Sequence, residues 1–213
     1  QFAVLDPSFT LTLPVRQVGN GVVDAFVHVI EQYLTYPTNA PLQDRFAESI
    51  LSTLIEEGPK ALATPDDYAV RANIMWCACM ALNGLIGQGV PQDWSTHMIG
   101  HEVTAVHGLD HAQTLAVVLP ALLRVKIDQK RAKLEQLGQR VFGMPAPDAA
   151  ATIDAIQAFF ERMGVPTRLA GYDLDRSAVK PVIDSLEKNG MLALGEHGDI
   201  TPAVATQILE LSS

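Results

Sequence analysis

The feature that most limits what this chain can fold into is a helical spacing of apolar residues, which recurs between glycine and proline breaks. Strand signals are almost absent, and no repeat or low-complexity segment occurs. In the segment of about 16–36, the spacing places the apolar residues on one face of a long helix; they are Val18, Val22, Ala25, Phe26, Val29, Ile30 and Tyr33. The sequence therefore predicts an all-α fold, a helical bundle.

The same pattern predicts further helices, with glycine or proline in each gap between them. Pro37 is expected to stop the first helix, and Gly58-Pro59 the second. The segment Thr64-Pro65-Asp66-Asp67 has the composition of an N-terminal cap for an apolar third helix. The remaining helices are expected at 41–57, 94–107, 110–125 with an interruption near Pro120, 130–142, 147–163, 175–188 and 202–211.

Composition narrows the class of protein. The 213 residues are 48% hydrophobic and 18% charged, enough for a substantial core in one large or two small domains. The net charge is −9 and the lysines and arginines are scattered, so nucleic acid is not an expected partner. The uncharged run 72–92 contains asparagines, glycines and Pro91, which favours a buried core helix ending in a loop over a membrane span.

The cysteines indicate the compartment. Cys77 and Cys79 are too close on a helix to bridge each other, and no Cys-x-x-Cys motif occurs. They are interpreted as buried thiols of a reducing cytoplasm. The chain opens on Gln1 and a short strand-like apolar piece, Phe2-Ala3-Val4-Leu5, without a methionine or a secretory signal. We expect a domain excised from a longer protein.

Histidines and one aspartate form the candidate site. Five of the six histidines lie in two apolar, helix-like stretches, and the pairs Asp24/His28 and His97/His101 are each four residues apart. Residues four apart share a helix face, so each pair projects two ligand-type side chains into one space. A carboxylate on so apolar a helix needs a cation or several donors to compensate it. That geometry suits a divalent metal.

Each of these residues also has a structural interpretation. An Asp-x-x-x-His pair is more often a core hydrogen-bond pair than a metal site, and His97 could bond to His101. His107-Gly108 is typical of a helix end, where a histidine needs no function. His111 begins a helix rich in Ala, Leu and Val, where an unpaired imidazole costs stability. One carboxylate with three imidazoles suits Fe(II) or Zn(II), and the lack of cysteine ligands argues against a structural zinc.

Two segments carry a resemblance to a known family. The run 21–33 reads G-x-x-D-A-x-x-H-x-x-E-x-Y, and the run 96–120 contains Thr-His-Met-Ile-Gly-His-Glu, Gly-Leu-Asp-His-Ala and Leu-Pro. Both resemble the metal segments of the iron-containing (group III) alcohol dehydrogenases. The similarity extends from Phe2 to the C-terminus. In detail the sequence most resembles the bacterial branch of NADPH-dependent aldehyde reductases and butanol dehydrogenases.

The resemblance implies roles for individual residues. Asp24, His28, His97 and His111 take the metal-ligand positions. His101 takes the position of a non-ligand histidine beside the nicotinamide and the substrate, a catalytic and cofactor-binding role. Most members have His-Gly at the last ligand, whereas this chain has His111-Ala112 and an earlier His107-Gly108. The distance to Leu119-Pro120 favours His111 as the ligand.

The family implies a two-domain enzyme. Its N-terminal α/β domain binds NADP(H) or NAD(H) through a Gly-Gly-Gly-Ser loop, which this sequence lacks. Residues 1–213 would then be the helical metal-binding domain, resembling the C-terminal domain of the dehydroquinate synthase-like fold. The implied enzyme is a cytoplasmic homodimer that interconverts primary alcohols and aldehydes by hydride transfer with one Fe2+ or Zn2+. This chain alone is expected to be inactive.

Two other functions also fit these residues. A metal-dependent hydrolase could use a helical His/Asp site to activate water, although its usual adjacent His-Asp pair is missing. A non-catalytic helical module could use the same residues only for packing or oligomerisation. Neither interpretation predicts aldehyde-dependent oxidation of a nicotinamide cofactor.

Overall fold

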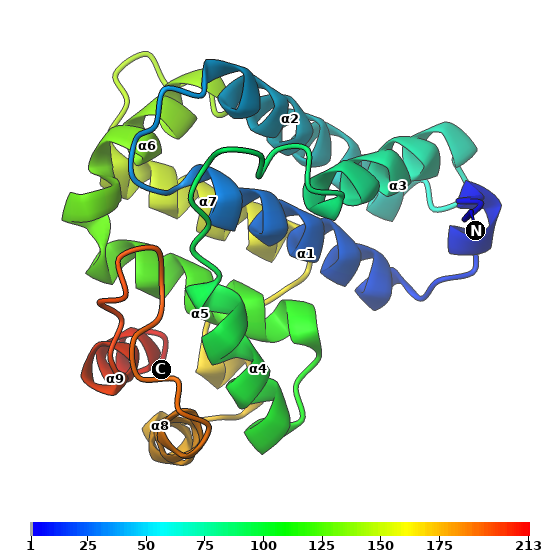
Figure 1. Ribbon diagram of the computed structural model, residues 1–213. Coiled ribbons are helices and arrows are strands. Elements are labelled where there is room, and N and C mark those ends of the chain that lie inside the picture. Colours follow the sequence, from blue (N-terminus) through cyan, green and yellow to red (C-terminus); the bar gives the residue numbers. More distant parts are fainter. Residues whose placement is uncertain (1) are drawn as a thin grey trace.

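The long helix α1, Val15–Tyr33, runs through the middle of the molecule and is buried along most of its length (Figure 1). The structure is a computed structural model that describes residues 2–213; Gln1, where the expected strand-like piece begins, lies outside these residues. Helices α2 and α3 pack against one side of α1, and α5 packs against another. The ring of Phe26 contacts Phe159 and Phe160 of α7, with centroids 5.1 and 5.6 Å apart.

The all-α prediction is confirmed: within residues 2–213 the structure contains helices and only an isolated β-bridge between Leu194 and Ile200. The α-helices after α1 are α2 (Pro41–Ala63), α3 (Tyr68–Leu82), α4 (Ser95–His107), α5 (His111–Val125), α6 (Ile127–Arg140), α7 (Ala149–Arg162), α8 (Val179–Lys188) and α9 (Pro202–Leu211). Three short 3-10 helices are η1 (Pro7–Thr10), η2 (Leu169–Tyr172) and η3 (Arg176–Ala178).

Helix α5 is the second central element. Its residues from Leu115 to Leu123 are all buried, because α4, α7 and α9 pack around it beside α1. Helix α8 covers α4 and α9 from outside. The candidate site residues lie in the middle of α1, at the start of α4 and at the start of α5, and these three parts meet at one place.

The end predicted for the second helix, α2, is wrong. It was expected to stop at Gly58-Pro59, but it continues to Ala63. Pro59 cannot donate to the carbonyl of Ile55, and Arg162 of α7 donates to that oxygen instead, at 3.3 Å. A Cβ on Gly58 would lie 2.9 Å from Val22 Cγ1, so the glycine permits close packing of α2 on α1. Tertiary contacts thus offset the local helix-breaking signal.

Pro120 also fails to act as expected. Helix α5 runs through it without an interruption, and Pro120 is buried among apolar neighbours. An interior proline costs a helix roughly 3 kcal/mol. Burial of the surrounding leucines and valines on several sides outweighs that cost, because each buried side chain of this kind contributes about 1.5–3 kcal/mol.

The segment 72–92 is a helix ending in a loop, as expected, but it is not a buried core helix. Asp67 caps α3 by accepting from the N–H groups of Ala69 and Val70. The side chains of Trp76 and Leu82 are 62% and 57% exposed, because the apolar residues of α3 surround the helix and only one side of it packs on α1 and α2. Within the described residues, no helix is both long and apolar enough to span a membrane.

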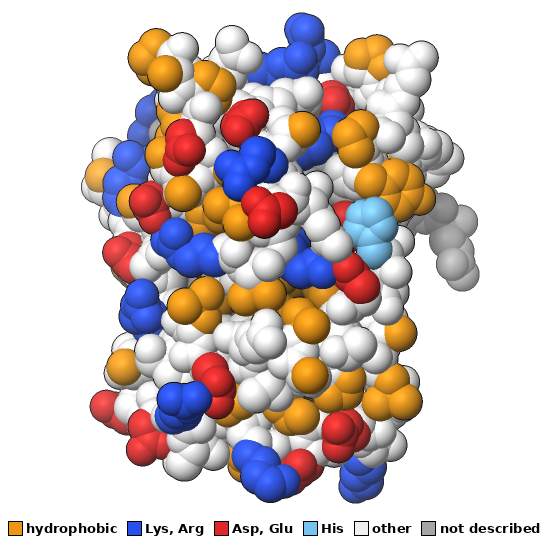
Figure 2. Space-filling model, turned by 90° about the vertical axis from the view of Figure 1, so that its left-hand side faces the viewer, with side chains coloured by type: hydrophobic (Ala, Val, Ile, Leu, Met, Phe, Trp, Pro, Cys, Tyr) orange, Lys and Arg blue, Asp and Glu red, His pale blue; other side chains and the backbone are white. Residues whose placement is uncertain are grey.

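Two smaller expectations differ as well. The apolar residues at 2–5 form no strand, and Phe2 and Val4 are largely exposed. Cys77 is buried, as expected, whereas Cys79 is half-buried. On the face that Figure 2 shows, acidic and basic side chains alternate among hydrophobic ones and form no basic stripe. That pattern agrees with the scattered cations of the sequence.

Candidate metal centre

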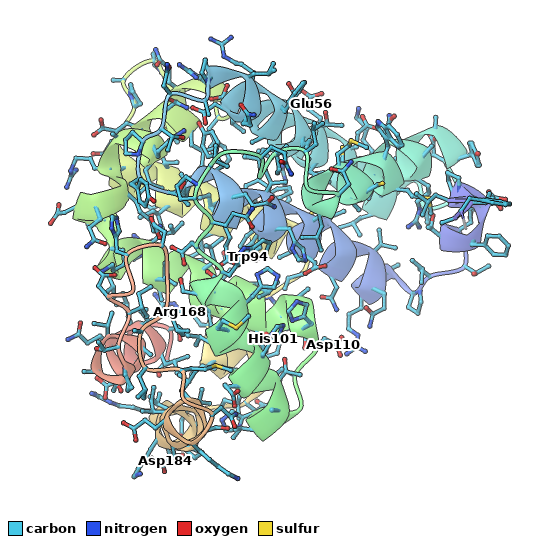
Figure 3. The ribbon with its side chains drawn as sticks, viewed as in Figure 1. Glu56, Trp94, His101, Asp110, Arg168 and Asp184 are labelled. Carbon is cyan, nitrogen blue, oxygen red and sulfur yellow. The ribbon has the colours of Figure 1, made fainter. Side chains whose placement is uncertain are left out.

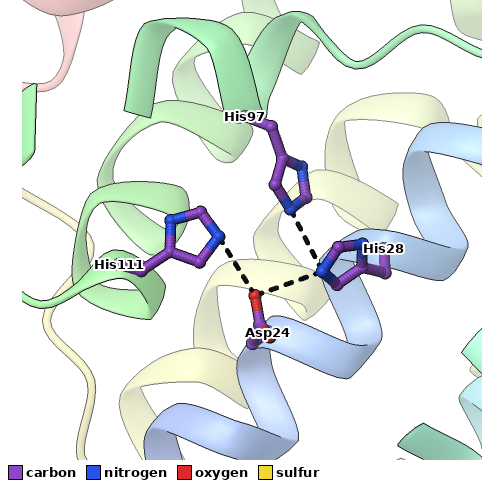
Figure 4. A group of neighbouring side chains, drawn as sticks. All are labelled: Asp24, His28, His97 and His111. Atoms are coloured by element: carbon purple, nitrogen blue, oxygen red, sulfur yellow. Dashed lines mark hydrogen bonds and ion pairs between the residues drawn. The ribbon is translucent and has the colours of Figure 1, made fainter. Parts of the chain in front are cut away.

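Four side chains from three helices converge beside α1 (Figure 4). Asp24 and His28 lie one turn apart on α1, His97 lies in the first turn of α4, and His111 is the first residue of α5. Each of them offers one ligand atom, and these four atoms all lie within 4.8 Å of one another. The structure therefore brings together the four residues that the family resemblance assigned as ligands.

Asp24 lies close to two of the histidines, and the other two-residue contact joins His97 to His28. Asp24 Oδ1 lies 3.6 Å from His28 Nε2 and 3.5 Å from His111 Nε2. His97 Nε2 lies 3.3 Å from His28 Nε2. The three imidazole nitrogens and the carboxylate oxygen thus face one common point.

The start of α5 is fixed by contacts with α1. Gly108 ends α4 with a φ of 73°, a left-handed conformation that glycine adopts easily and that turns the chain towards α5. Asp110 then accepts a hydrogen bond from Asn20 of α1 at 3.0 Å and from Gln17 at 3.3 Å. Because Asp110 directly precedes His111, these bonds hold that histidine over Asp24.

Burial keeps the imidazoles of the site neutral. Burial, opposed by Asp24 and reinforced by His101, lowers the pKa of His97 to about 4. Burial likewise lowers the pKa values of His28 and His111, and neighbouring imidazoles lower them further, while Asp24 acts in the opposite direction. A neutral imidazole has a free lone pair, which is the form that binds a metal.

The residues fit a bound cation. Asp24 Oδ1 is buried and has no hydrogen-bond partner, although a buried carboxylate oxygen without donors is costly. Three neutral nitrogens face it and cannot supply a compensating charge. A divalent ion bound among one oxygen and three nitrogen ligands would satisfy Asp24, and this donor set matches a catalytic rather than a closed structural zinc or iron site.

His101 lies beside this group but is not part of it. It follows His97 by one turn on α4, and its ring stacks on that of His111 with centroids 5.0 Å apart. No hydrogen bond joins it to His97, whose ring centroid is 6.0 Å away. Burial, with a contribution from His111, lowers the pKa of His101. Figure 3 shows it on α4, in the same part of the view as Trp94 and Asp110.

His107 lies elsewhere. It ends α4, and its Nε2 is 2.9 Å from the carbonyl oxygen of Ala178, beside α8. The structure therefore places it with a structural partner and brings His111 to the other three residues, the arrangement that the distance to Leu119-Pro120 favoured.

Two neighbours of the site were not predicted. The ring of Trp94 lies 5.3 Å from that of His97 and 5.7 Å from that of His28, measured between centroids. Glu31 Oε2 is hydrogen-bonded to His97 Nδ1. A signal for Glu31 was present, since it follows His28 by three residues on the same helix face as Asp24. Trp94 has no comparable signal, because it precedes α4 in a loop.

Comparisons with known proteins identify a family. The model of a protein family described as "Fe-containing alcohol dehydrogenase family, C-terminal" matches residues 19–209. The NADPH-dependent aldehyde reductase YqhD of Escherichia coli (strain K12) is 61% identical, covering 98% of this chain and 55% of that protein. The probable NADH-dependent butanol dehydrogenase 1 of Bacillus subtilis (strain 168) is 37% identical, covering 100% of this chain and 56% of that protein.

Solved structures show the same fold. The substrate- and cofactor-free form of the E. coli aldehyde reductase YqhD aligns with a TM-score of 0.97 at 59% identity, covering 100% of this chain and 57% of that chain. A butanol dehydrogenase A from Thermotoga maritima aligns with a TM-score of 0.92 at 26% identity, covering 98% and 55%. The chain spans about half the length of the curated relatives it matches.

Proposed function

Because the chain belongs to the Fe-containing alcohol dehydrogenase family, we propose that it supplies the metal-binding part of an NAD(P)H-dependent enzyme that interconverts primary alcohols and aldehydes. Residues 1–213 form the helical metal domain in this proposal. The nicotinamide cofactor is bound mainly by residues outside this chain, since the sequence contains no Gly-Gly-Gly-Ser loop.

The observation that carries the proposal is the convergence of four donor atoms within 4.8 Å of one another, contributed by Asp24, His28, His97 and His111. These four residues hold one Fe2+ or Zn2+. When bound, such an ion supplies a Lewis acid for a carbonyl or alcohol oxygen. The lack of a fifth protein ligand in the group supports an open position for substrate.

His101 acts next to this site rather than in it. Its ring lies against His111, and its side chain is exposed, so it can contact a substrate or a nicotinamide held between this domain and the rest of the enzyme. We assign one of its ring nitrogens to holding and transferring the proton of the alcohol. A histidine whose pKa lies below its usual value is neutral at pH 7 and can accept that proton.

The remaining parts of the proposal rest on the family and on composition. Short aldehydes and primary alcohols are the proposed substrates, and NADPH or NADH is the proposed cofactor, since the relatives' names contain both. The unpaired Cys77 and Cys79 support a reducing compartment, the cytoplasm. A homodimer of the full-length protein is proposed from the family resemblance, and light scattering would measure its mass.

The test is an activity assay on the full-length gene product. Loaded with Fe2+ or Zn2+ and given a short aldehyde such as butanal, it should oxidise NADPH or NADH, and removal of the metal by a chelator should abolish turnover. Ester or amide hydrolysis without any nicotinamide requirement would favour a hydrolase. A protein that binds no metal and oxidises no cofactor would contradict the proposal.

A further inference from the structure

Glu31 is a buried carboxylate beside the candidate metal centre that the proposed function does not use. It lies on α1, is only 3% exposed, and has both carboxylate oxygens occupied. Its Oε1 accepts from the backbone N–H of Thr96 at 2.6 Å, and its Oε2 is hydrogen-bonded to His97 Nδ1. Both partners belong to the first turn of α4, so one side chain of α1 holds that turn at two points.

The contact with Glu31 determines which nitrogen of His97 is free. When Glu31 accepts the proton on Nδ1, the lone pair of the neutral ring is on Nε2, the atom 3.3 Å from His28 Nε2. His28 lacks such a partner, since its Nδ1 is buried without a hydrogen bond. Of these two imidazoles, only that of His97 has a carboxylate hydrogen-bonded to its Nδ1.

A second set of contacts anchors the same backbone. The N–H of Asp93 donates to the carbonyl oxygen of Glu31 at 2.8 Å, and Asp93 Oδ1 accepts from the N–H of Ser95 at 2.9 Å. The buried Lys130 Nζ donates to Asp93 Oδ2 at 2.8 Å and to the carbonyl oxygen of Leu34 at 2.6 Å. The loop that precedes α4 is therefore tied to α1 at the backbone of Glu31 and, through Lys130, to Leu34 at the end of α1.

We propose that Glu31 is a positioning residue of the metal centre, which fixes the tautomer and the ring orientation of His97 through Nδ1 and so presents Nε2 to the ion. The proposal rests on the proposed function, because it assumes that His97 is a ligand. Carboxylate partners of this kind orient metal-bound histidines and make them more basic, and their loss typically costs 10–100-fold in metal affinity.

Glu31→Gln is the informative substitution because it keeps the shape of the side chain. A glutamine has a single acceptor oxygen, so it cannot accept from both Thr96 N–H and His97 Nδ1. We expect the full-length protein with Glu31→Gln to bind Zn2+ about 10–100-fold more weakly in competition with a chelator. With Co2+ as a spectroscopic probe, the visible absorption of the bound ion should also change, because the His97 ligand is no longer held in place.

Glu48→Gln is the matched control. Glu48 is a similarly buried carboxylate, 7% exposed, and it accepts from Tyr33, Gln136 and Arg140 away from the candidate metal centre. Its replacement removes the same charge and leaves donors unpaired, so it should lower the melting temperature. The affinity for Zn2+ and the Co2+ spectrum should stay at the unsubstituted level.

A double-variant cycle separates positioning from general destabilisation. If Glu31 acts through His97, Glu31→Gln should not weaken metal binding any further in a His97→Ala background. Should Glu31→Gln fail to fold, Glu31→Asp retains both acceptor oxygens on a side chain one methylene shorter. The affinity of Glu31→Asp for Zn2+ should lie between the affinities of Glu31→Gln and the unsubstituted protein. If the glutamine variant does not fold, Glu31→Asp is compared with the unsubstituted protein and should bind Zn2+ more weakly.

The outcomes are distinguishable. Tight Zn2+ binding by the unsubstituted protein together with equal binding by Glu31→Gln, or by Glu31→Asp where that variant is the one measured, would overturn the role of Glu31 and leave the metal centre intact. Equal losses in Glu31→Gln and Glu48→Gln would also overturn it. An unsubstituted protein that binds no divalent ion would contradict the proposed metal site, and this inference with it.

Discussion

At the scale of single residues, Asp24 is the most informative side chain of the site. Its Oδ1 is buried without a hydrogen-bond donor, and the atoms closest to it in the group are imidazole nitrogens 3.5 and 3.6 Å away. Those imidazoles are neutral near pH 7, because burial lowers the pKa values of His28 and His111. The arrangement is unfavourable without a cation and favourable with one.

A first prediction follows for metal-linked stability. A divalent ion at about 100 times its Kd should raise the melting temperature of the protein by roughly 5–10 °C, because it binds the folded state alone. Asp24→Ala or His97→Ala should abolish that rise. Asp128→Ala is the control, since the side chain of Asp128 is 90% exposed on α6. An unchanged rise in both site variants, measured by calorimetry, would refute the ligand assignment.

A second prediction separates His101 from the ligands. The ring of His101 stacks on His111 but lies outside the group of four donor atoms. His101→Ala in the full-length protein should therefore retain the bound metal, measured by elemental analysis, while turnover falls by about 10²–10⁴-fold through loss of proton transfer. If His101→Ala lost metal as completely as His28→Ala, the proposed role would have to be withdrawn.

At the scale of helices, close approach between elements determines which positions accept a side chain. Gly19 and Gly21 lie two residues apart on α1, but their surroundings differ. A Cβ on Gly19 would lie 2.3 Å from the carbonyl oxygen of Met163 at the end of α7, whereas a Cβ on Gly21 would meet nothing within 4 Å. Gly19 therefore permits the contact between α1 and the end of α7, and Gly21 has no such packing role.

The third prediction uses this difference. Gly19→Ala should lower the free energy of unfolding by about 1–3 kcal/mol, because the backbone of α7 must move. Gly21→Ala should raise it by about 0.5–1 kcal/mol, because alanine loses less entropy in a helix interior. Urea denaturation of both variants provides the comparison. Equal effects of the two substitutions would show that the α1–α7 contact is looser than in the structure.

A fourth prediction concerns the loop between α8 and α9. Glu196 contacts the buried Lys130 of α6 at 2.9 Å. Burial, with a contribution from Asp93, raises the pKa of Glu196 from 4.5 to about 7. Between these two values the folded protein keeps a proton that the unfolded chain has lost. The proton on Glu196 therefore adds to the free energy of unfolding. This contribution is complete below about pH 4.5 and is lost as the pH rises to about 7.

Glu196→Gln should remove this dependence. The free energy of unfolding of the unsubstituted chain, relative to that of Glu196→Gln, should decrease as the pH rises from 4.5 to 7. Urea titrations of both proteins at several pH values measure the difference, which cancels the titration of other groups. Parallel curves over that range would mean that Glu196 titrates normally in the folded state.

At the scale of the whole molecule, the site is formed where α1, α4 and α5 meet, and its exposed side carries His101. The chain spans about half the length of its relatives, and its sequence contains no phosphate-binding Gly-Gly-Gly-Ser loop. The hydride transfer proposed for the full-length enzyme would require a nicotinamide held against the substrate at this exposed side. In the proposed enzyme, the residues described here supply the candidate metal ligands and no recognised anchor for the cofactor.

The fifth prediction is that the isolated chain is catalytically silent. A titration of residues 1–213 with NADPH should show at most weak binding, whereas the full-length gene product should bind it and reduce short aldehydes. Circular dichroism provides the control that the isolated chain is helical. Robust turnover by the isolated chain would overturn the two-domain account.

Much of the architecture could be predicted from local pattern. Helical periodicity and caps such as Asp67 depend on neighbouring residues, so α1, α4 and α9 begin and end within about three residues of the predicted limits. The helix-breaking signals at Gly58-Pro59 and Pro120 gave a wrong end for α2 and a wrong interruption of α5, both for the same reason. Their cost is local, but the contacts that offset it come from distant segments; Arg162, for example, lies 107 residues from Ile55.

The sequence by itself determined the helical class, the pairing of Asp24 with His28 on one face, and the family. Each of these depends on residue types at short, regular spacing, which the chain encodes directly. Only the tertiary structure decided that His111 joins the group while His107 faces Ala178, and that Glu31 holds His97 from 66 residues away. Those contacts depend on the packing of α1, α4 and α5, because a helix face specifies what must be buried and leaves open which distant residue covers it.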